Sequence, residues 1–256
     1  MEKLIIVKVG GGVLEDPATL NDFLNQFAAI PDKKILVHGG GRAATKLSKQ
    51  LGIETKMVDG RRITDEETIK IVTMVYGGLI NKNAVAALQA KGCNALGLTG
   101  VDMNLISAVK RPVAEIDYGL VGDVTSVNTF AFNLLLQADF TPVIAPITHD
   151  NKGQLLNTNA DTVASSIATS LVNLYDVSLV YCFEKAGVLS DPEHDDSVIA
   201  ELNFEMYQHY KKDGVIHSGM IPKLDNSFKA LEMGVREVLI TNASTLNAIK
   251  GTHLSL

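Results

Sequence analysis

Tryptophan is absent from this chain of 256 residues, and all aromatic residues together make up only 5% of it. Hydrophobic residues make up 46%, so Val, Ile, Leu and Ala must form most of the core, which is typical of a buried parallel sheet. Cysteine is also rare, with Cys93 and Cys182 the only two. Two thiols in a chain of this length exclude a disulfide framework and indicate a reducing compartment.

Other absences exclude whole classes of partner. The net charge is −6 and the sequence has no basic block or stripe. We therefore do not expect a nucleic acid as a partner. No apolar run reaches the roughly 20 residues that span a bilayer, and the first residues lack the pattern of a signal peptide. No Cys/His cluster has zinc spacing, and no Gly-x-Ser-x-Gly elbow indicates a hydrolase. We therefore expect a cytoplasmic protein without membrane contact and without a metal site of its own.

Two short apolar strands each run directly into three consecutive glycines. Residues 4–9 precede Gly10-Gly11-Gly12, and residues 35–38 precede Gly39-Gly40-Gly41. Glycines after a strand expose backbone N–H groups, and a helix that starts there adds its unpaired N–H groups and positive dipole end. Such loops bind phosphate, although glycines that only form tight turns would give the same pattern.

The second loop formally matches a dinucleotide-binding fingerprint, Gly39-x-Gly41-x-x-Ala44. The acid that this fingerprint requires about 20 residues on would be Asp59, but Asp59 stands in an expected loop rather than at the end of a strand. No P-loop sequence is present. The chain therefore resembles neither of these nucleotide-binding classes closely.

Strands and helices alternate along the chain, which predicts an α/β fold with a mainly parallel central sheet. Apolar residues recur at helical spacing in three places and predict the buried faces of three helices. These residues are Leu20, Phe23, Leu24 and Phe27 after the first glycine loop, Ala43, Ala44, Leu47 and Leu51 after the second, and Leu224, Phe228 and Leu231 after Pro222. Thr64-Asp65-Glu66-Glu67 predicts a helix start near Thr64 through a capping box. Turn residues in 109–127 predict antiparallel hairpins inserted on the main sheet. The remaining expected elements are strands at 95–98, 141–146, 178–182 and 238–241 and a helix at 159–174.

Two lysines stand where a cation needs an anionic partner. Lys8 ends a strand of Ile, Leu and Val beside the first glycine loop, where its ammonium can reach over the mouth of the loop. Lys223 follows Gly219-Met220-Ile221-Pro222 at the start of an expected helix, where the helix dipole disfavours a cation. A nucleotide phosphate would satisfy both lysines. The alternatives are an edge lysine for Lys8 and a solvated surface lysine for Lys223.

Two further segments gather polar groups. Asn157, Asn159 and Asp161 alternate on the approach to the helix at 159–174, which fits ordinary capping and a functional site equally well. Arg61 and Arg62 follow Gly60 in a loop, and an arginine fork suits a carboxylate, although one of the pair can equally be solvated.

Taken in order, these segments resemble the amino acid kinase superfamily, which includes carbamate kinase, and within it the N-acetylglutamate kinase family. The resemblance runs from Lys3 to about Leu254. The motifs that carry it are Lys8-Val9-Gly10-Gly11, Val37-His38-Gly39-Gly40-Gly41, Gly60-Arg61-Arg62-Ile63-Thr64, Asn157-Thr158-Asn159-Ala160-Asp161, Gly187-Val188-Leu189, Gly219-Met220-Ile221-Pro222-Lys223 and Gly251-Thr252. Each motif is weak alone, and their shared order makes the resemblance specific.

The resemblance implies a three-layer αβα sandwich and one domain over residues 1–256. An amino-terminal lobe, about 1–174, would bind an N-acylated glutamate, and a carboxy-terminal lobe, about 175–256, would bind ATP. The family transfers the γ-phosphoryl group of MgATP to the side-chain carboxylate of the acylglutamate, in arginine biosynthesis. The Mg²⁺ would be carried by the nucleotide, and the protein would be a homodimer.

The resemblance also implies roles for single residues. Lys8 and Lys223 would stabilise the transferring phosphoryl group, and Asp161 would orient both lysines. Backbone N–H groups at Gly10, Gly11, Gly40 and Gly41 would contact phosphate and substrate. Arg62 and Asn157, with Asn159 beside them, would hold the α-carboxylate end of the substrate.

The chain departs from the family pattern at two places. Phe183-Glu184 stands where the family usually has Thr-Asp, which leaves nucleotide contacts there open. Arg42 follows the second glycine loop where many relatives have Pro or a small residue, and the extra cation predicts acceptance of an acidic acyl group such as succinyl. The chain also begins without the extension of arginine-inhibited relatives, from which we expect no feedback by arginine.

Three alternatives remain at this point. A sister kinase of the same fold would phosphorylate carbamate, aspartate or glutamate. A ligand-sensing module on this fold would have no catalysis, although it would not need Lys8, Asp161 and Lys223 together. A dinucleotide oxidoreductase would use the second glycine loop as its cofactor site.

Overall fold

The computed structural model describes residues 1–58, 60–191, 193–216, 220–248 and 250–256. Asp59, the acid considered for the dinucleotide fingerprint, and Gly219, of the motif that ends in Lys223, lie outside the described residues. The chain forms two compact units. The first unit joins Met1–Ile35 to Ala164–Leu256, and the second consists of Leu36–Val163.

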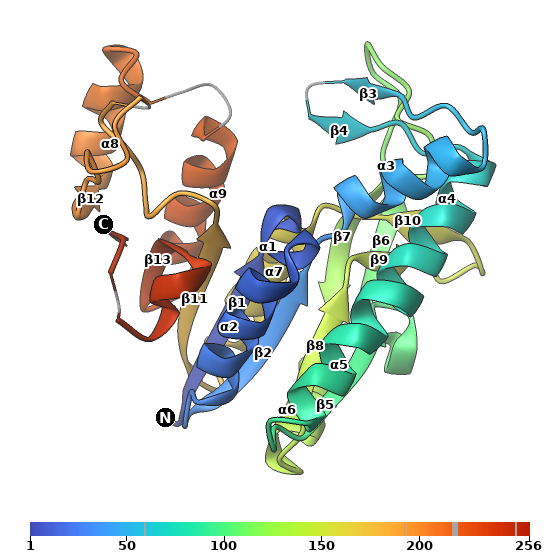
Figure 1. Cartoon of the computed structure of the whole chain (residues 1–256), viewed down its shortest axis with the longest axis horizontal. Coiled ribbons are helices and arrows are strands. Elements are labelled where there is room, and N and C mark those ends of the chain that lie inside the picture. Colours follow the sequence, from blue (N-terminus) through green and yellow to red (C-terminus); the bar gives the residue numbers. More distant parts are fainter. Residues whose placement is uncertain (59, 192, 217–219, 249) are drawn as a thin grey trace. The chain divides into compact units, whose positions relative to one another are not determined.

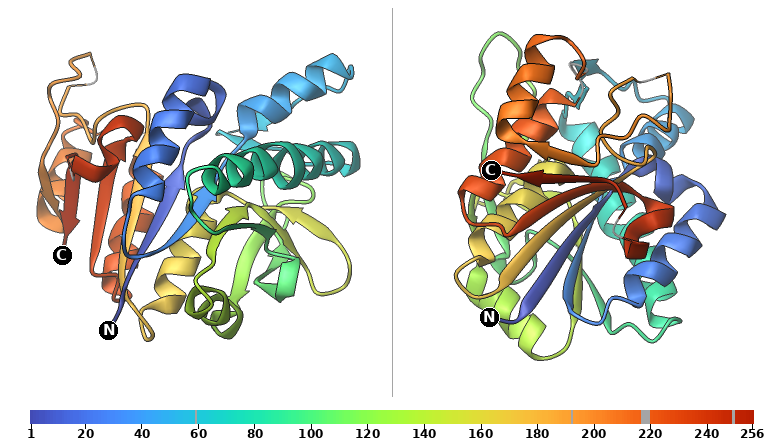
Figure 2. Two further views of the ribbon diagram at one scale, coloured as in Figure 1. Left: turned by 60° about the horizontal axis from the view of Figure 1, so that its bottom comes forward. Right: turned by 90° about the vertical axis from the view of Figure 1, so that its left-hand side faces the viewer.

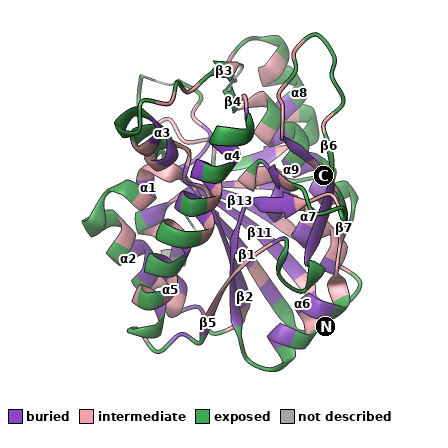
Figure 3. Ribbon diagram, turned by 90° about the vertical axis from the view of Figure 1, so that its right-hand side faces the viewer, coloured by how far each residue is buried: buried purple, intermediate pink, exposed green. Residues whose placement is uncertain are grey.

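The first unit contains a mixed sheet in which parallel pairs predominate. Its strand order is β12 (Glu201–Asn203), β14 (Thr252–Ser255), β13 (Glu237–Asn242), β11 (Asp176–Phe183) and β1 (Lys3–Val9). β1 pairs in parallel with β11, and β11 with β13, while β14 runs antiparallel to β13. The strands β1, β11 and β13 are largely buried, as Figure 3 shows in purple.

Helices cover both faces of this sheet, which is the predicted three-layer αβα arrangement. α1 (Gly11–Glu15) and α2 (Pro17–Ala28) follow β1, and α2 packs against the short 3₁₀ segment η3 (Ala243–Ala248). α9 (Ile221–Glu232) and the larger part of α7 (Ala160–Leu171) cover the other face, and α8 (Phe204–Lys212) packs on β12 (Figures 1 and 2). The buried side chains Phe23, Leu24 and Phe27 confirm the apolar face predicted for the helix after the first loop.

The second unit contains parallel strands and a separate four-stranded mixed sheet, in which β6 runs parallel to β9 and the other two pairs are antiparallel. β2 (Lys33–His38) begins at the end of the first unit, and then β2, β8 (Thr141–Ala145) and β5 (Ala95–Thr99) lie in this order, all parallel. The four-stranded sheet has the order β10 (Leu155–Asn157), β9 (Ile147–His149), β6 (Ile106–Lys110) and β7 (Gly122–Val127). β3 (Met57–Val58) and β4 (Arg61–Arg62) form a two-stranded ribbon.

The helices of the second unit include one long composite helix. α4 (Glu66–Val72), the π-helix η1 (Thr73–Ile80) and α5 (Asn81–Gln89) run on from one another, with α3 (Gly41–Gln50), the 3₁₀ turn η2 (Asp102–Asn104) and α6 (Thr129–Gln137) elsewhere in the unit. Of the described helices, Glu66–Gln89 is the one long and apolar enough to cross a membrane by length and composition alone. Core helices of soluble proteins pass the same test.

Four expectations need correction. The helix after Thr64 begins one residue later than predicted, because Asp65 rather than Thr64 caps it and accepts the N–H of Thr68 at 2.8 Å. Leu51, expected on a buried helix face, is 56% exposed at the end of α3. The hairpin region has only one pair of strands, β6 with β7, and that pair belongs to a sheet with β9 and β10, which were not predicted.

The fourth correction concerns the first glycine run, which is part of a helix rather than a loop before one. Gly10 is the N-cap of α1, and Gly11 and Gly12 form its first turn. β1 pairs with β11 along its whole length, so both strands belong to the first compact unit. The two lobes expected at about 1–174 and 175–256 stay a prediction. Which ligand each lobe binds stays a prediction.

Candidate active site

The first glycine run is held at the end of β1 by the neighbouring strand. The N–H of Gly10 donates to the carbonyl of Cys182 at 3.0 Å, which continues the parallel ladder one residue beyond β1. The N–H groups of the first turn of α1 have no partner within that helix, since they belong to its N-terminus. Burial raises the pKa of the Cys182 thiol to about 12, with Lys8 opposing the shift, so this sulfur stays protonated below the loop.

Lys8 and Lys223, 215 positions apart in sequence, meet at one aromatic ring in the first unit. The Nζ atom of Lys223 lies 3.8 Å from the centroid of Phe183, and that of Lys8 lies 5.0 Å from it. Lys8 is buried at the end of β1, and Lys223 is half-buried in the first turn of α9. The two lysines predicted to act together are therefore neighbours.

Glu184 borders the same glycine run. Its carboxylate lies against Gly12, so that any side chain at position 12 would meet it. Phe183 and Glu184, which depart together from the family pattern, thus contact different parts of the site. Phe183 lies against the lysines, and Glu184 lies beside the first turn of α1.

Two motifs that are distant in sequence meet behind this site. The Val188 N–H donates to the hydroxyl of Thr252 at 2.8 Å, which joins the segment Gly187-Val188-Leu189 to Gly251-Thr252. Thr252 is fully buried, and β14 begins with it. The contact fixes the chain that follows Glu184, so both motifs have a structural role in the first unit.

The second glycine run, in the second unit, packs tightly on the long composite helix. Gly40 is the N-cap of α3, and a Cβ atom built there would lie 2.6 Å from Cδ1 of Ile80 and 2.7 Å from Cδ1 of Tyr76. Only glycine allows this close approach without displacement of η1. Gly41 begins α3, so its N–H belongs to the unpaired donors of that helix.

Arg62 is buried beside this loop and holds it. Its Nη2 atom donates to the carbonyl of Gly41 at 2.8 Å and to the hydroxyl of Thr45 at 2.7 Å. Burial raises the pKa of the Tyr76 phenol, and the neighbouring Arg62 opposes that shift. The guanidinium is thus anchored next to Gly41, while Arg61 of the same pair is exposed.

Asn157 is linked to Arg62 through Thr64. The Asn157 Nδ2 atom donates to the Thr64 hydroxyl at 3.0 Å, and that hydroxyl donates to the carbonyl of Arg62 at 3.2 Å. All three residues are buried. The structure therefore brings together the two residues predicted to hold the α-carboxylate end of a substrate.

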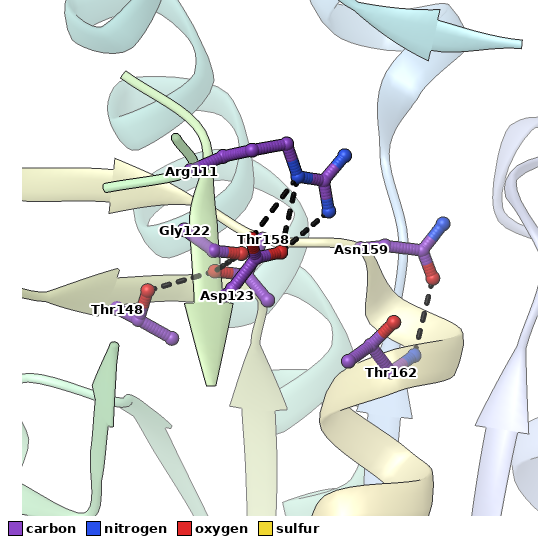
Figure 4. A network of polar contacts seen from close by, with 7 residues as sticks. All are labelled: Arg111, Gly122, Asp123, Thr148, Thr158, Asn159 and Thr162. Carbon is purple, nitrogen blue, oxygen red and sulfur yellow. Dashed lines mark hydrogen bonds and ion pairs between the residues drawn. The ribbon is translucent and has the colours of Figure 1, made fainter. Parts of the chain in front are cut away.

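Residues that follow Asn157 or lie on the neighbouring strands form a second set of polar contacts, which Figure 4 shows. The hydroxyl groups of Thr148 and Thr158 are 2.7 Å apart, and Thr158 also donates to the carbonyl of Gly122 at 3.4 Å. Arg111 forms a bidentate ion pair with Asp123 on the neighbouring strand β7. These contacts fix β7 and β10 and thereby the position of Asn157.

Asn159 caps α7, as its sequence position allowed. Its Oδ1 atom accepts the N–H of Asp161 at 2.7 Å. It also accepts the N–H of Thr162 at 3.1 Å, the bond that Figure 4 draws. Asp161 is half-buried in the first turn of the helix. Because Asp161 belongs to the second unit and the lysines to the first, its predicted orientation of Lys8 and Lys223 stays a prediction.

His38 lies directly below the second glycine run and is fully buried. Its Nδ1 atom is 2.8 Å from the carbonyl of Gly39, and its Nε2 atom is 3.1 Å from Nδ2 of Asn81. These partners assign the proton to Nδ1. Burial lowers the pKa of His38 to about 4, with the Gly39 carbonyl opposing and the Lys82 charge adding to the shift. Histidine is therefore neutral here.

Sequence reasoning missed three residues that shape these loops: Phe183 as a partner of the lysines, Tyr76 and Asn81. Asn81 is fully buried, and its Nδ2 atom also donates to the carbonyl of Val143 at 2.8 Å, which ties the end of β2 to β8. Asn81 is followed by Lys82 and Asn83, so its polarity did not distinguish it from exposed helical residues. Tyr76 lies in a π-helix, for which the sequence offers no periodic signal.

The fold and these glycine runs define an α/β protein in which two glycine runs begin helices and two lysines converge on one aromatic ring. A family model described as the amino acid kinase family matches residues 3–242. The chain therefore belongs to the amino acid kinase family, as the motifs predicted.

Curated relatives extend this result over nearly the whole chain. The protein named acetylglutamate kinase from Bacteroides thetaiotaomicron is 60% identical over 99% of this chain and 98% of its own length. The protein of the same name from Bacteroides fragilis (strain YCH46) is 58% identical over 99% of this chain and 97% of its own. A more distant relative of that name, from Methanopyrus kandleri, is 39% identical over 96% of this chain and 98% of its own length.

Solved structures agree on the fold. A crystal structure of a Streptococcus mutans UA159 protein has a TM-score of 0.83 at 28% identity and covers 98% of both chains. Carbamate kinase from Giardia lamblia, bound to AMP-PNP, has a TM-score of 0.71 at 16% identity over 99% of this chain and 98% of its own. The predicted amino acid kinase fold is confirmed.

Proposed function

We propose that this chain is a kinase that transfers the γ-phosphoryl group of ATP to the side-chain carboxylate of N-acetyl-L-glutamate, as a step of arginine biosynthesis. The near-complete match to proteins named acetylglutamate kinase, at up to 60% identity, carries the proposal. The meeting of Lys8 and Lys223 beside the first glycine run supports it, because phosphoryl transfer needs convergent positive charge.

The reaction needs cations more than it needs a base. A carboxylate is already a nucleophile at neutral pH, but it repels the triphosphate that it must attack. Ammonium groups and backbone N–H donors offset this repulsion and stabilise the charge on the equatorial oxygens in the transition state. We assign this role to Lys8, Lys223 and the N–H groups at Gly10 and Gly11, with Asp161 as the residue that orients the lysines.

The substrate end of the site belongs to the second unit. We assign recognition of the α-carboxylate to Arg62 and Asn157, with Asn159 and the N–H groups at Gly40 and Gly41 completing the contacts. The hydrogen bonds of Arg62 to Gly41 and Thr45 support this assignment, because they hold a planar fork of N–H donors beside the loop. In-line alignment of donor and acceptor would supply much of the remaining rate enhancement.

Magnesium would enter with the nucleotide. Within the described ranges, no three His, Cys, Asp or Glu side chains gather into a group that could hold a metal ion. A Mg²⁺ ion that keeps most of its waters and binds the phosphates needs no protein cage. The ion would neutralise phosphate charge, and the chain would contribute positioning.

A coupled assay of ADP release tests the proposed function. The assay compares N-acetyl-L-glutamate, N-succinyl-L-glutamate, free glutamate, aspartate and carbamate with MgATP and the purified protein. We expect turnover with acylated glutamate and little with the other three. Preferred turnover of aspartate, glutamate or carbamate would instead identify a sister kinase, and no turnover at all would favour a ligand-sensing module.

The same assay decides the acyl group. Arg42 is exposed at the start of α3, one residue beyond Gly41. A cation there would favour an acidic acyl group, so succinylglutamate is a substrate to be compared directly with acetylglutamate. A clear preference for acetylglutamate that persists in Arg42→Ala would remove Arg42 from substrate selection.

We also propose that the enzyme works in the cytoplasm as a homodimer. The two reduced cysteines are buried, which suits a reducing compartment. Analytical ultracentrifugation across a hundredfold range of protein concentration tests the dimer, and a monomer throughout that range would contradict it.

A further inference from the structure

Phe183 contacts both lysines, and its place in the sheet explains how. Lys8 pairs with Tyr181 in the parallel register of β1 and β11, and Phe183 follows Tyr181 by two residues. Since side chains alternate along a strand, Tyr181 and Phe183 lie on one face of the sheet, and Lys8 projects from that same face. Lys223 reaches the ring from the first turn of α9.

The ring itself is fixed. Tyr181 is fully buried and stacks on Phe183, with ring centroids 6.1 Å apart and an interplanar angle of 4°. Cδ1 of Phe183 also lies 3.7 Å from the position that a Cβ of Gly10 would have, so the first glycine run borders the ring. A buried tyrosine and the backbone of the phosphate loop thus set the position of this aromatic face.

We propose that Phe183 is a positioning residue that holds Lys8 and Lys223 together, charged, in readiness for the phosphoryl group. This inference rests on the proposed function. The two ammonium groups repel each other, and the N-terminus of α9 adds further positive potential to Lys223. The negative face of an aromatic ring attracts both cations without a formal charge of its own.

A neutral ring adds a contact to the lysines without adding charge to the site. In the proposed site, Asp161 would supply the negative charge that orients the lysines, and the ring would hold the two ammonium groups near one another. Because the lysines are positioned before reaction, less reorganisation accompanies the charge that develops in the transition state.

The test changes the charge distribution of the ring while its volume is nearly kept. Phenylalanine at position 183 is replaced by its 4-fluoro, 3,5-difluoro and pentafluoro forms, since fluorine withdraws electron density from the ring face. We expect kcat with the acylglutamate that the enzyme prefers to fall stepwise through the series. The kcat of the pentafluoro form should be about tenfold lower than that of the wild type, equivalent to about 1.4 kcal/mol in the activation barrier. KM for ATP should change less.

Conventional variants separate positioning from packing. Phe183→Tyr keeps the aromatic face and should keep nearly all of kcat, whereas Phe183→Leu should lower it about as much as the pentafluoro form. Phe204→Leu is the matched control, because Phe204 is also an aromatic residue of the first unit but contacts Tyr207 and Phe228 instead. It should leave kcat unchanged. A constant kcat across the fluorinated series would overturn the proposal.

A second readout works without any acceptor substrate. The rate at which acetic anhydride acetylates Lys223, followed by mass spectrometry, should rise with fluorination, because a weaker ring holds the ammonium form less. If the wild-type protein phosphorylates no acylglutamate, the proposed function is wrong. The labelling rates would still decide whether the ring holds Lys223. Equal labelling rates in all ring variants would also overturn the proposal.

Discussion

At the scale of single residues, the strongest expectation concerns the two lysines. Lys8→Ala and Lys223→Ala should each lower kcat by about 10²–10³-fold, with smaller changes in KM, because each ammonium acts mainly on charge that develops in the transition state. Lys229→Ala, in the exposed part of the same helix as Lys223, should leave kcat unchanged. Wild-type kcat in a lysine variant that is folded by circular dichroism would remove that lysine from the mechanism.

His38 gives a residue-scale prediction about stability and pH. Its pKa falls from 6.5 to about 4 on folding, chiefly through burial, so between these values the unfolded chain binds more protons than the folded one. Above pH 6.5 His38 is neutral in both states, and the free energy of unfolding is unaffected by its titration. As the pH falls from 6.5 towards 4, protonation of the unfolded chain lowers the free energy of unfolding. Urea unfolding at pH 7 and pH 5 should show a loss of about 2 kcal/mol from this group. The loss should be absent in His38→Gln, and an equal loss in both proteins would contradict the assignment.

At the scale of elements, the packing of the second glycine run on η1 is the feature to test. Gly40→Ala places a methyl group 2.6 Å from Ile80 and 2.7 Å from Tyr76, so it should lower the free energy of unfolding by about 1–3 kcal/mol. It should also raise KM for the acylglutamate, because the loop carries substrate contacts in the proposed site. Urea unfolding and initial-rate kinetics measure the two effects.

The control for that change is Gly78→Ala in η1, the helix on which Gly40 packs. No atom lies within 4 Å of a Cβ at this position, so the substitution should leave the stability equal or slightly higher. A similar destabilisation by both substitutions would show that contact with Ile80 and Tyr76 does not explain the loss at Gly40.

Elements also show what the sequence could predict. The apolar spacing of Leu224, Phe228 and Leu231 predicted the buried face of α9, because that signal is local. The cap of α4 was misplaced by one residue because Thr64 and Asp65 can both cap a helix. Thr64 is instead bound to the distant Asn157, and no local pattern reports such a contact.

In the candidate site, too, local motifs were predictable and contacts between distant residues were not. The motifs named Lys8, Lys223, Arg62 and Asn157 from sequence, and the structure pairs them as neighbours within each unit. The role of Phe183 could not be predicted, although its departure from the family pattern was visible. Its contacts depend on the register between β1 and β11, which joins residues more than 170 positions apart.

At the scale of the whole molecule, the assignment of one ligand to each unit makes a prediction about thermal stability. A ligand present at about 100 times its Kd stabilises the folded state by about 2.7 kcal/mol, which raises the Tm of a protein of this size by roughly 5–10 °C. MgATP and acylglutamate should each produce such a shift in wild-type protein. Differential scanning fluorimetry measures both shifts.

Variants then separate the two ligands. Lys223→Ala changes a residue of the first unit and should reduce the shift with MgATP while that with acylglutamate persists. Arg62→Lys changes the second unit, loses the planar fork, and should do the reverse. Equal loss of both Tm shifts in each variant would contradict the assignment of one ligand to each unit, because each substitution would then weaken the binding of both ligands.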